Sequence, residues 1–290
     1  MLEPHPARAT PLGPLTVWRA LPTRGRRLVG PWCFLDRYGP LSFSDDKPMD
    51  VAPHPHIGIQ TVSWLLEGEV IHHDTLGFEG LVRPGGVNVM TSGRGIAHAE
   101  ETPRGNSGRL NGLQLWVALP DAHRHVAPAF QHIPEVPRVE SRGGIAQTII
   151  GDGSGATSFS DILGLDVQIH ANETWSASLQ SSREHAIFLC DGDATLEGQH
   201  LDVNTLYYLG TDRTELSIVS GAGARLLLLG GEPLNETVLM WWNFVARTRE
   251  EIATARASWE AGEFGEVTAY KGPRLHAPPL GLLAPPNPAS

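Results

Sequence analysis

Two pairs of side chains with metal-binding chemistry stand out in this chain: His54 with His56, and His98 with Glu100. One residue separates the members of each pair, and His98 lies 42 positions after His56. Imidazole nitrogens and a carboxylate oxygen suit a transition metal, and four protein ligands leave two positions open on an octahedral ion. These residue types therefore predict a metal centre that can also bind further small ligands.

The spacing within each pair constrains the elements that carry it. Alternate side chains of a β-strand point to the same face, so both pairs can converge on one spot if both lie on strands. Apolar runs separated by turns rich in Gly and Pro predict strands at 59–66, 70–73, 87–91 and 113–119. We therefore expect a β-barrel around the four side chains.

A second block of the chain repeats this pattern. The segments 64–70 and 188–194 both combine an apolar strand, an acidic residue with glycine, and the start of a new strand. This order predicts a duplicated barrel. The further strands are expected at 147–150, 163–170, 174–179, 186–190, 205–209, 215–219 and 224–229. The sequence matches place Ser178, Gln180, Thr214 and Leu216 opposite the four ligand-type residues, so we expect one metal site per chain, in the first barrel.

The predicted fold is all-β, with two facing barrels and a short C-terminal helix. We expect an N-terminal metal-binding domain over 1–130 and a metal-free C-terminal domain over 131–290, with a linker at 121–144. The helix is predicted from Thr248 to Ala261, because Thr248 followed by Glu251 forms a capping-box pattern.

Bulk properties limit the class of protein. The net charge of -10 argues against nucleic acid as a direct partner, because phosphate binding needs a basic surface. Cys33 and Cys190 lie far apart in apolar runs and are expected to be reduced core residues. No signal peptide or apolar run of membrane-spanning length is present, so we expect a cytoplasmic monomer without a membrane partner.

The segment from His54 to His98 resembles the two-part motif of the cupin superfamily, with Gly93 in place of the motif proline and Gln60 in place of its glutamate. The chain resembles the pirin family more narrowly, from about residue 15 to 260. The motifs that carry this resemblance are His54-Pro55-His56, the segment from Met90 to Glu100, and the segment from Gly112 to Val117. Ile57 and Gln60 differ from the residues that many members carry.

The pirin resemblance implies a bicupin with one iron site in the N-terminal barrel, held by His54, His56, His98 and Glu100. It also implies an Fe(II)-dependent quercetin 2,3-dioxygenase activity, which opens the ring of a flavonol or acts on a related enol. The alternative is a non-catalytic, iron-dependent redox sensor that binds a transcription factor or a metabolic enzyme. An open pocket would favour catalysis and a closed one regulation. A third hypothesis is a cupin isomerase that acts on sugars, but no distinctive sequence feature supports it.

Two further residues are candidates for a role beside the metal. Gln60 is expected either to hydrogen-bond a ligand or metal-bound water, or to fill the barrel. His72 and His73 are adjacent, so only one of them can point inward, and His72 is the candidate for a proton shuttle. The alternative for His72 is a structural or solvent-facing imidazole.

Overall fold

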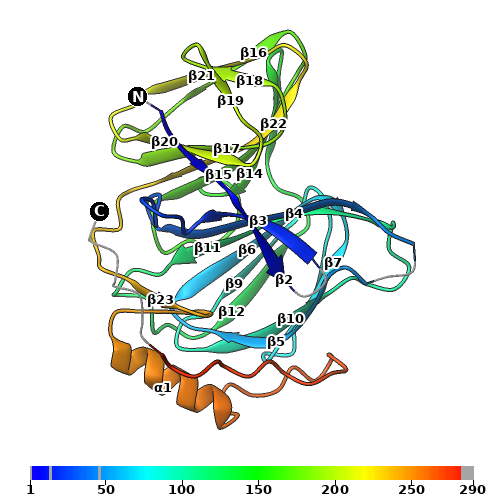
Figure 1. Ribbon diagram of the computed structural model, residues 1–290, viewed down its shortest axis with the longest axis vertical. Helices are drawn as coiled ribbons and strands as arrows, with labels where there is room; N and C mark the ends of the chain where they lie inside the picture. Colours follow the sequence, from blue (N-terminus) through cyan, green and yellow to red (C-terminus); the bar gives the residue numbers. More distant parts are fainter. Residues whose placement is uncertain (1, 13–14, 45–46, 282–290) are drawn as a thin grey trace. The chain divides into compact units, whose positions relative to one another are not determined.

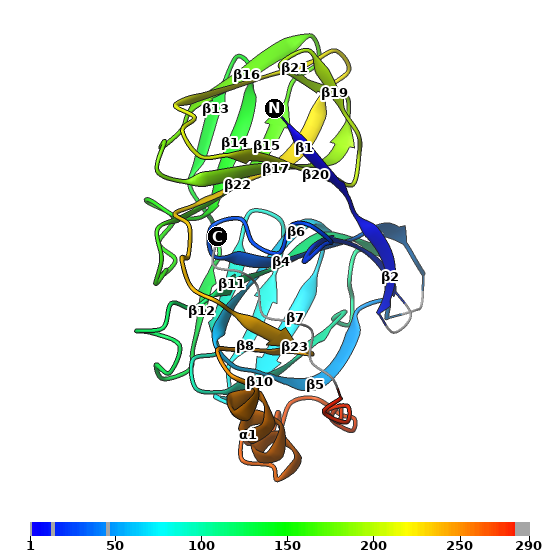
Figure 2. The same cartoon turned by 60° about the vertical axis from the view of Figure 1, so that its left-hand side comes forward.

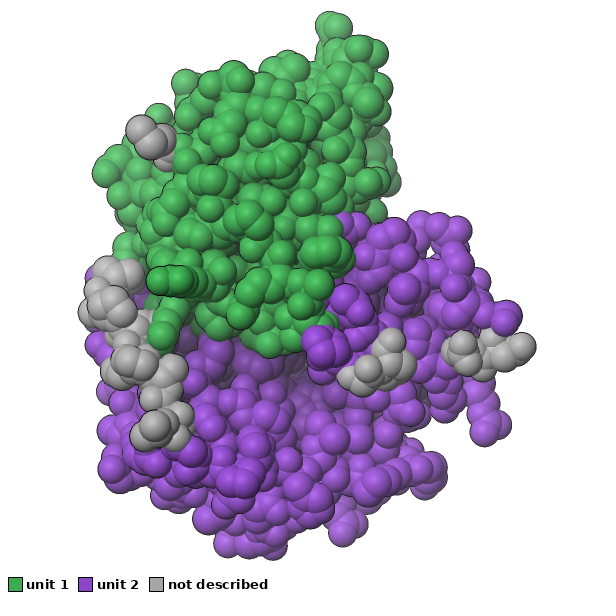
Figure 3. All heavy atoms as spheres, viewed as in Figure 1, with its two compact units in different colours: residues 1–10, 18–36, 135–233 green, residues 11–17, 37–134, 234–290 purple. Residues whose placement is uncertain are grey.

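The computed structural model describes residues 2–12, 15–44 and 47–281, and these residues are folded almost entirely into β-strands (Figure 1). The described chain separates into two compact units, coloured separately in Figure 3. We name them after the barrels at their centres. The N-terminal barrel comprises residues 11–17, 37–134 and 234–290, and the C-terminal barrel comprises 1–10, 18–36 and 135–233. Both predicted barrels are therefore present.

The N-terminal barrel is built from a four-stranded sheet and a seven-stranded sheet. The four-stranded sheet has the order β5 (Asp50–His56), β10 (Ile96–Glu101), β7 (Val70–Asp74), β8 (Glu79–Val82). The seven-stranded sheet has the order β12 (Ala129–Ile133), β9 (Val87–Thr91), β6 (Ile59–Gly68), β11 (Arg109–Ala118), β4 (Trp32–Ser42), β3 (Leu15–Leu21), β2 (Arg8–Leu12). The chain crosses the division between the units within β2, β3 and β4.

The C-terminal barrel repeats this plan. Its larger sheet has the order β1 (Glu3–Pro6), β20 (Thr205–Gly210), β17 (Glu184–Gly192), β22 (Ala224–Gly231), β15 (Ile162–Ile169), β14 (Gly144–Ile150), β13 (Arg138–Ser141). Its smaller sheet has the order β16 (Glu173–Ser178), β21 (Glu215–Ser220), β18 (Ala194–Leu196), β19 (Gln199–Leu201). All strand pairs with a recorded register are antiparallel, and most predicted strands coincide with observed ones to within a few residues.

The predicted domain division differs from the observed one in two respects. The segment 121–144, expected to be a linker, contains β12 and β13 and is divided between the units. The C-terminal segment from 234, expected in the second domain, belongs to the N-terminal barrel. This difference has a physical cause. The apolar face of a short helix predicts that the helix packs against a sheet, but it does not specify which sheet.

The C-terminal segment covers the four-stranded sheet of the N-terminal barrel. Strands β23 (Leu239–Trp241) and β24 (Phe244–Ala246) form a hairpin, and α1 (Arg249–Glu260) follows. In both orientations of the ribbon, α1 lies next to β5 and β10 (Figures 1 and 2). Ile252, Ala255 and Trp259 on its buried face belong to one apolar cluster with Ala97 and Ala99 of β10.

The start of α1 confirms the predicted cap. The Thr248 side chain accepts a hydrogen bond from the backbone N–H of Glu251, and the Glu251 carboxylate accepts one from the Thr248 backbone N–H. This reciprocal pair satisfies amide groups that have no partner within the first helical turn. Within the described part of the chain, no helix is long and apolar enough to cross a membrane.

Both cysteines lie in the core, as expected. Cys33 and Cys190 are both buried, and no disulfide joins them. Their surroundings are apolar strands, β4 and β17. They therefore serve as small packing residues rather than as a disulfide or a metal-binding pair.

Candidate metal centre

The two predicted ligand pairs lie on neighbouring strands. His54 and His56 end β5, while His98 and Glu100 lie on β10 beside it. His54 pairs directly with His98, and a register shift follows between His98 and Glu100. Because side chains alternate along a strand, Ala97 and Ala99 face the helix layer while His98 and Glu100 face the barrel interior. The structure therefore places both pairs on adjacent strands of one sheet.

The three imidazoles form a compact group. The ring centroid of His98 lies 4.4 Å from that of His54 and 5.0 Å from that of His56, and 5.0 Å separates His54 from His56. One ring nitrogen from each lies within 4.8 Å of the others. The side chains are buried, with only 8% of His54 and 1% of His56 and His98 exposed. This arrangement can hold one ion out of contact with bulk water.

Backbone carbonyl groups fix two of these rings. His54 Nδ1 lies 2.9 Å from the carbonyl oxygen of Ala52, and His56 Nδ1 lies 3.1 Å from that of Asn243. A carbonyl oxygen only accepts hydrogen bonds, so each Nδ1 carries the proton and donates it. Each Nε2 then has a free lone pair directed into the cluster, which is the state that a metal requires.

The unpaired ring nitrogens fit a metal ion. His56 Nε2 and His98 Nε2 are 3.1 Å apart in a buried site. Two lone pairs at this distance repel each other unless a cation or a proton lies between them. Neighbouring ligand nitrogens of an octahedral ion are about 3 Å apart when each bond is about 2.1 Å. The observed distance therefore matches the edge of a coordination shell.

Burial keeps these imidazoles neutral. Desolvation lowers the pKa of His54 to about 4, and it moves the pKa values of His56 and His98 well below 6.5. The neighbouring histidines act in the same direction as desolvation on all three pKa values, because each disfavours a second positive charge nearby. The lone pairs are consequently available near neutral pH.

Glu100 lies at the side of the cluster nearer to β7. A carboxylate oxygen of Glu100 lies within 4.8 Å of a ring nitrogen of His98 and of His72. His98 also forms such a triplet with His54 and His56. The four predicted ligands and His72 thus form two overlapping triplets that share His98. Burial raises the pKa of Glu100, against the opposing effects of His72 and of the Ser63 hydroxyl 3.1 Å from Oε1. Ser63 also lies 2.9 Å from Gln114 Oε1.

The two supporting candidates have different positions. His72 faces the interior, with Nδ1 3.2 Å from His98 Nδ1 and its ring stacked on Phe130. Its neighbour His73 lies near Glu79 and Glu101 instead, so His72 is the inward residue of the pair. Gln60 is fully buried on β6, but it lies on the face opposite Ser63 and donates to Thr91 Oγ1. This geometry gives no support to a role for Gln60 beside the metal.

Sequence reasoning missed several residues that shape the site. Ser63, Asp74 and Phe130 contact Glu100 or His72, and the carbonyl of Asn243 holds His56. A polar residue at position 63 within an apolar strand was a usable signal for an inward-facing group. Phe130 and Asn243 gave no such signal, because the histidines that they contact are remote from them in sequence.

Comparisons with known proteins agree with this geometry. The family profile described as Pirin matches residues 15–117, and the profile described as Pirin C-terminal cupin domain matches residues 164–265. A Caulobacter vibrioides pirin-like protein is 36% identical over 269 residues, covering 88% of this chain and 92% of its own length. The chain belongs to the pirin family.

Two further relatives of this pirin carry an enzyme name. A Pseudomonas aeruginosa protein named "Putative quercetin 2,3-dioxygenase" is 42% identical, covering 97% of this chain and 91% of its own length. The crystal structure of a quercetin 2,3-dioxygenase from Acinetobacter baumannii has a TM-score of 0.93 at 37% identity, covering 98% of this chain and 97% of that chain. A bacterial pirin from Escherichia coli, solved in complex with nickel(II), shares the fold with a TM-score of 0.65 at 19% identity, covering 80% of this chain and all of its own.

Proposed function

We propose that this pirin is an Fe(II)-dependent dioxygenase of the quercetin 2,3-dioxygenase type, acting on a flavonol or a related enol. The observation that carries the proposal is the group of three buried imidazoles beside Glu100, inside the barrel of a chain whose relatives bear that enzyme name. The proposed ligands are His54, His56, His98 and Glu100. Bound Fe(II) would supply a Lewis-acidic, redox-active centre for an enolate and dioxygen.

The protein contributes a preorganised and dry environment. The carbonyl groups of Ala52 and Asn243 orient two imidazoles before any ion arrives, so little reorganisation is needed on binding. The rings of Trp116 and His56 meet edge to face with their centroids 5.0 Å apart, and Phe130 stacks on His72 with a centroid distance of 4.3 Å. These rings exclude water from the ligand side chains, which protects a reactive enolate from competing proton transfer.

Oxygen uptake tests the proposed reaction. The protein is loaded anaerobically with Fe(II), mixed with quercetin, and exposed to oxygen, while oxygen consumption and the loss of flavonol absorbance are followed together. We expect uptake by the wild type and none above background by His56→Ala. The matched control is His200→Ala, which removes an exposed imidazole from β19 and should keep wild-type activity. Equal rates for all three proteins would refute the reaction.

Burial of the site favours a second candidate function, an iron-dependent redox sensor that binds a transcription factor or a metabolic enzyme. The four proposed ligands are each at most 8% exposed, so a change in oxidation state would act through the surrounding protein. A pull-down from lysate with Fe(II)-loaded and Fe(III)-loaded protein tests this role. A partner retained by only one oxidation state supports it, and identical partner sets from both contradict it.

The remaining expectations concern the cellular setting. The charge of -10 favours a small molecule or a protein as partner rather than nucleic acid. We propose that the protein acts as a cytoplasmic monomer. Sedimentation of the metal-loaded protein at several concentrations measures its mass directly, and a dimer would contradict the expected monomer.

A further inference from the structure

His98 differs from the other two imidazoles in what holds its ring. Carbonyl oxygens face Nδ1 of His54 and of His56, and they can only accept a proton. The group that faces His98 Nδ1 is another imidazole nitrogen, Nδ1 of His72, at 3.2 Å. An imidazole nitrogen can either donate or accept, so this contact alone leaves the tautomer of His98 undetermined.

Asp74 removes this ambiguity from the other side of His72. Its Oδ2 lies 3.2 Å from His72 Nε2, and both side chains are buried. Its Oδ1 accepts hydrogen bonds from the backbone N–H groups of Leu76 at 2.8 Å and Phe78 at 3.1 Å. The turn after β7 therefore fixes the carboxylate and leaves Oδ2 as an acceptor directed at His72.

The proton positions follow from this chain of contacts. A carboxylate acceptor requires a proton on His72 Nε2, and the neutral imidazole then keeps a lone pair on Nδ1. That lone pair requires His98 Nδ1 to carry a proton and donate it. His98 Nε2 is then free of hydrogen and faces His56 Nε2 at 3.1 Å. The stacked ring of Phe130, with an interplanar angle of 10°, holds the plane of His72 in this alignment.

We propose that Asp74 and His72 are positioning residues that set the tautomer and orientation of His98 for metal binding. Carboxylate groups that support a metal-bound histidine directly are a known device. Here an additional imidazole is inserted between the carboxylate and the ligand, which extends the support to a residue on a neighbouring strand. The inference rests on the proposed metal centre and not on the proposed reaction.

Asp74→Asn tests the direction of this chain of hydrogen bonds. The asparagine oxygen can still accept from Leu76 and Phe78, so its NH2 group would face His72 Nε2. His72 would then have to carry its proton on Nδ1, where it would oppose the Nδ1 proton of His98. We expect Ni(II) affinity about 10- to 100-fold weaker than in the wild type, measured by chelator competition. The visible spectrum of bound Co(II) should also change, because the geometry around His98 changes.

A second variant shows whether the effect passes through His72. His72→Phe keeps an aromatic ring against Phe130 but removes both nitrogens, so Ni(II) affinity should fall within the same range. Asp74→Asn added to His72→Phe should cause no further loss, because no imidazole remains to transmit it. His73→Phe on the same strand is the matched control and should bind Ni(II) as the wild type does. Thermal unfolding of each metal-free variant reports folding separately.

Each outcome of these measurements decides the inference. Wild-type affinity and an unchanged Co(II) spectrum in Asp74→Asn would overturn the positioning role while leaving the metal centre intact. Additive losses in the double variant would overturn transmission through His72. Failure of the wild type to bind Ni(II) would overturn the metal centre and this inference together. The inference is supported if Asp74→Asn and His72→Phe each weaken Ni(II) binding, His73→Phe does not, and the double variant binds Ni(II) no more weakly than the single variants.

Discussion

The two barrels share one sheet plan but differ in what fills them. In the N-terminal barrel, His54, His98 and Asp74 form one row across β5, β10 and β7. In the C-terminal barrel, a row of buried residues crosses the smaller sheet: Trp175 pairs with Ile218, which pairs with Leu196. The smaller sheet thus contributes a polar row to the interior of one barrel and an apolar row to the interior of the other.

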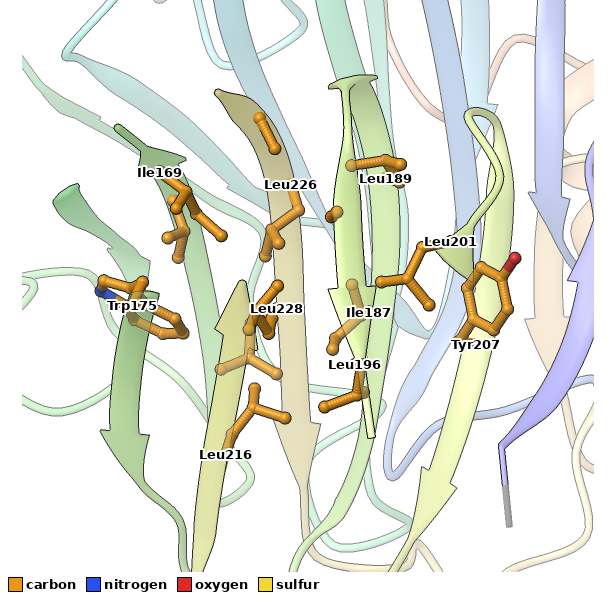
Figure 4. Packing of buried hydrophobic residues seen from close by; sticks show 14 of the residues in the cluster. Ile169, Trp175, Ile187, Leu189, Leu196, Leu201, Tyr207, Leu216, Leu226 and Leu228 are labelled. Carbon is orange, nitrogen blue, oxygen red and sulfur yellow. The ribbon is translucent and has the colours of Figure 1, made fainter. Parts of the chain in front are cut away.

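The apolar copy obtains its stability from packing. Trp175, Leu196 and Ile218 belong to one buried cluster of side chains from both sheets (Figure 4). The cluster also contains Leu226 and Leu228 of β22 and Leu189 of β17. Each fully buried aliphatic side chain contributes about 1.5–3 kcal/mol by leaving water. The polar copy gives up part of this contribution in its interior. Its buried histidines and carboxylates are tolerated because hydrogen bonds or a metal satisfy them.

The interior of the apolar barrel also bears on the predicted number of metal sites. The sequence matches place Ser178 and Thr214 opposite His54 and His98, and the inward row of the apolar barrel carries Trp175, Ile218 and Leu196. None of these side chains is a common metal ligand, so a single metal site per chain stays the prediction.

Exchanging the central residue of the polar row should have the largest effect. We expect His98→Ala to weaken Ni(II) binding by more than about 100-fold, beyond the loss caused by removing a supporting group. Elemental analysis after metal loading and desalting should find the wild type with one ion per chain and the variant without one. Retention of a full ion by His98→Ala would show that the row does not hold the metal.

The equivalent exchange in the apolar row should have the opposite outcome. Ile218→Ala leaves a cavity in a core position with 0% exposure and should destabilise the C-terminal barrel by about 2–5 kcal/mol. Urea unfolding monitored by tryptophan fluorescence measures the change. The metal content should remain at the wild-type level, and a loss of metal would indicate that the barrels are coupled.

The apolar barrel also contains a fully buried imidazole, His185, which should make its stability depend on pH. Desolvation, together with the positive charges of Arg183 and Arg213, lowers the pKa of His185 to about 4, against the opposing effect of the Gly210 backbone. The folded pKa lies below the unfolded value of about 6.5, so the unfolded chain takes up a proton first as the pH falls. The contribution of neutral His185 to the free energy of unfolding is therefore complete above about pH 6.5 and is lost progressively toward pH 4.

Comparison with a variant isolates this contribution. His185→Leu should show a shallower loss of unfolding free energy between pH 6.5 and pH 4 than the wild type, measured by urea titration at each pH. The histidines of the N-terminal barrel are present in both proteins, so their effect cancels in the difference. Parallel pH curves for the two proteins would contradict the assignment to His185.

The smallest expected effect concerns α1, the helix that packs on the polar barrel. Thr248→Ala removes the hydrogen bond to the Glu251 backbone and should cost about 1 kcal/mol. Faster amide exchange confined to the first turn of α1 would be the local signature. Thr248→Ser keeps the hydroxyl and should behave as the wild type, so an equal effect of both substitutions would argue against the cap.

Local patterns in the sequence determined most elements and the predicted ligands. The alternation of His54 with His56, and of His98 with Glu100, requires strands to bring each pair to one face. Thr248 and Glu251 were sufficient to locate the start of α1, because capping depends on residues three positions apart.

Only the tertiary structure decided which segments meet. It placed the C-terminal helix on the N-terminal barrel, directed the carbonyl of Asn243 to His56, and separated Gln60 from the cluster. It also joined Asp74 to His98 through His72. These outcomes depend on strand register and on contacts between residues remote in sequence, which no local pattern specifies because each is selected by the packing of the whole barrel.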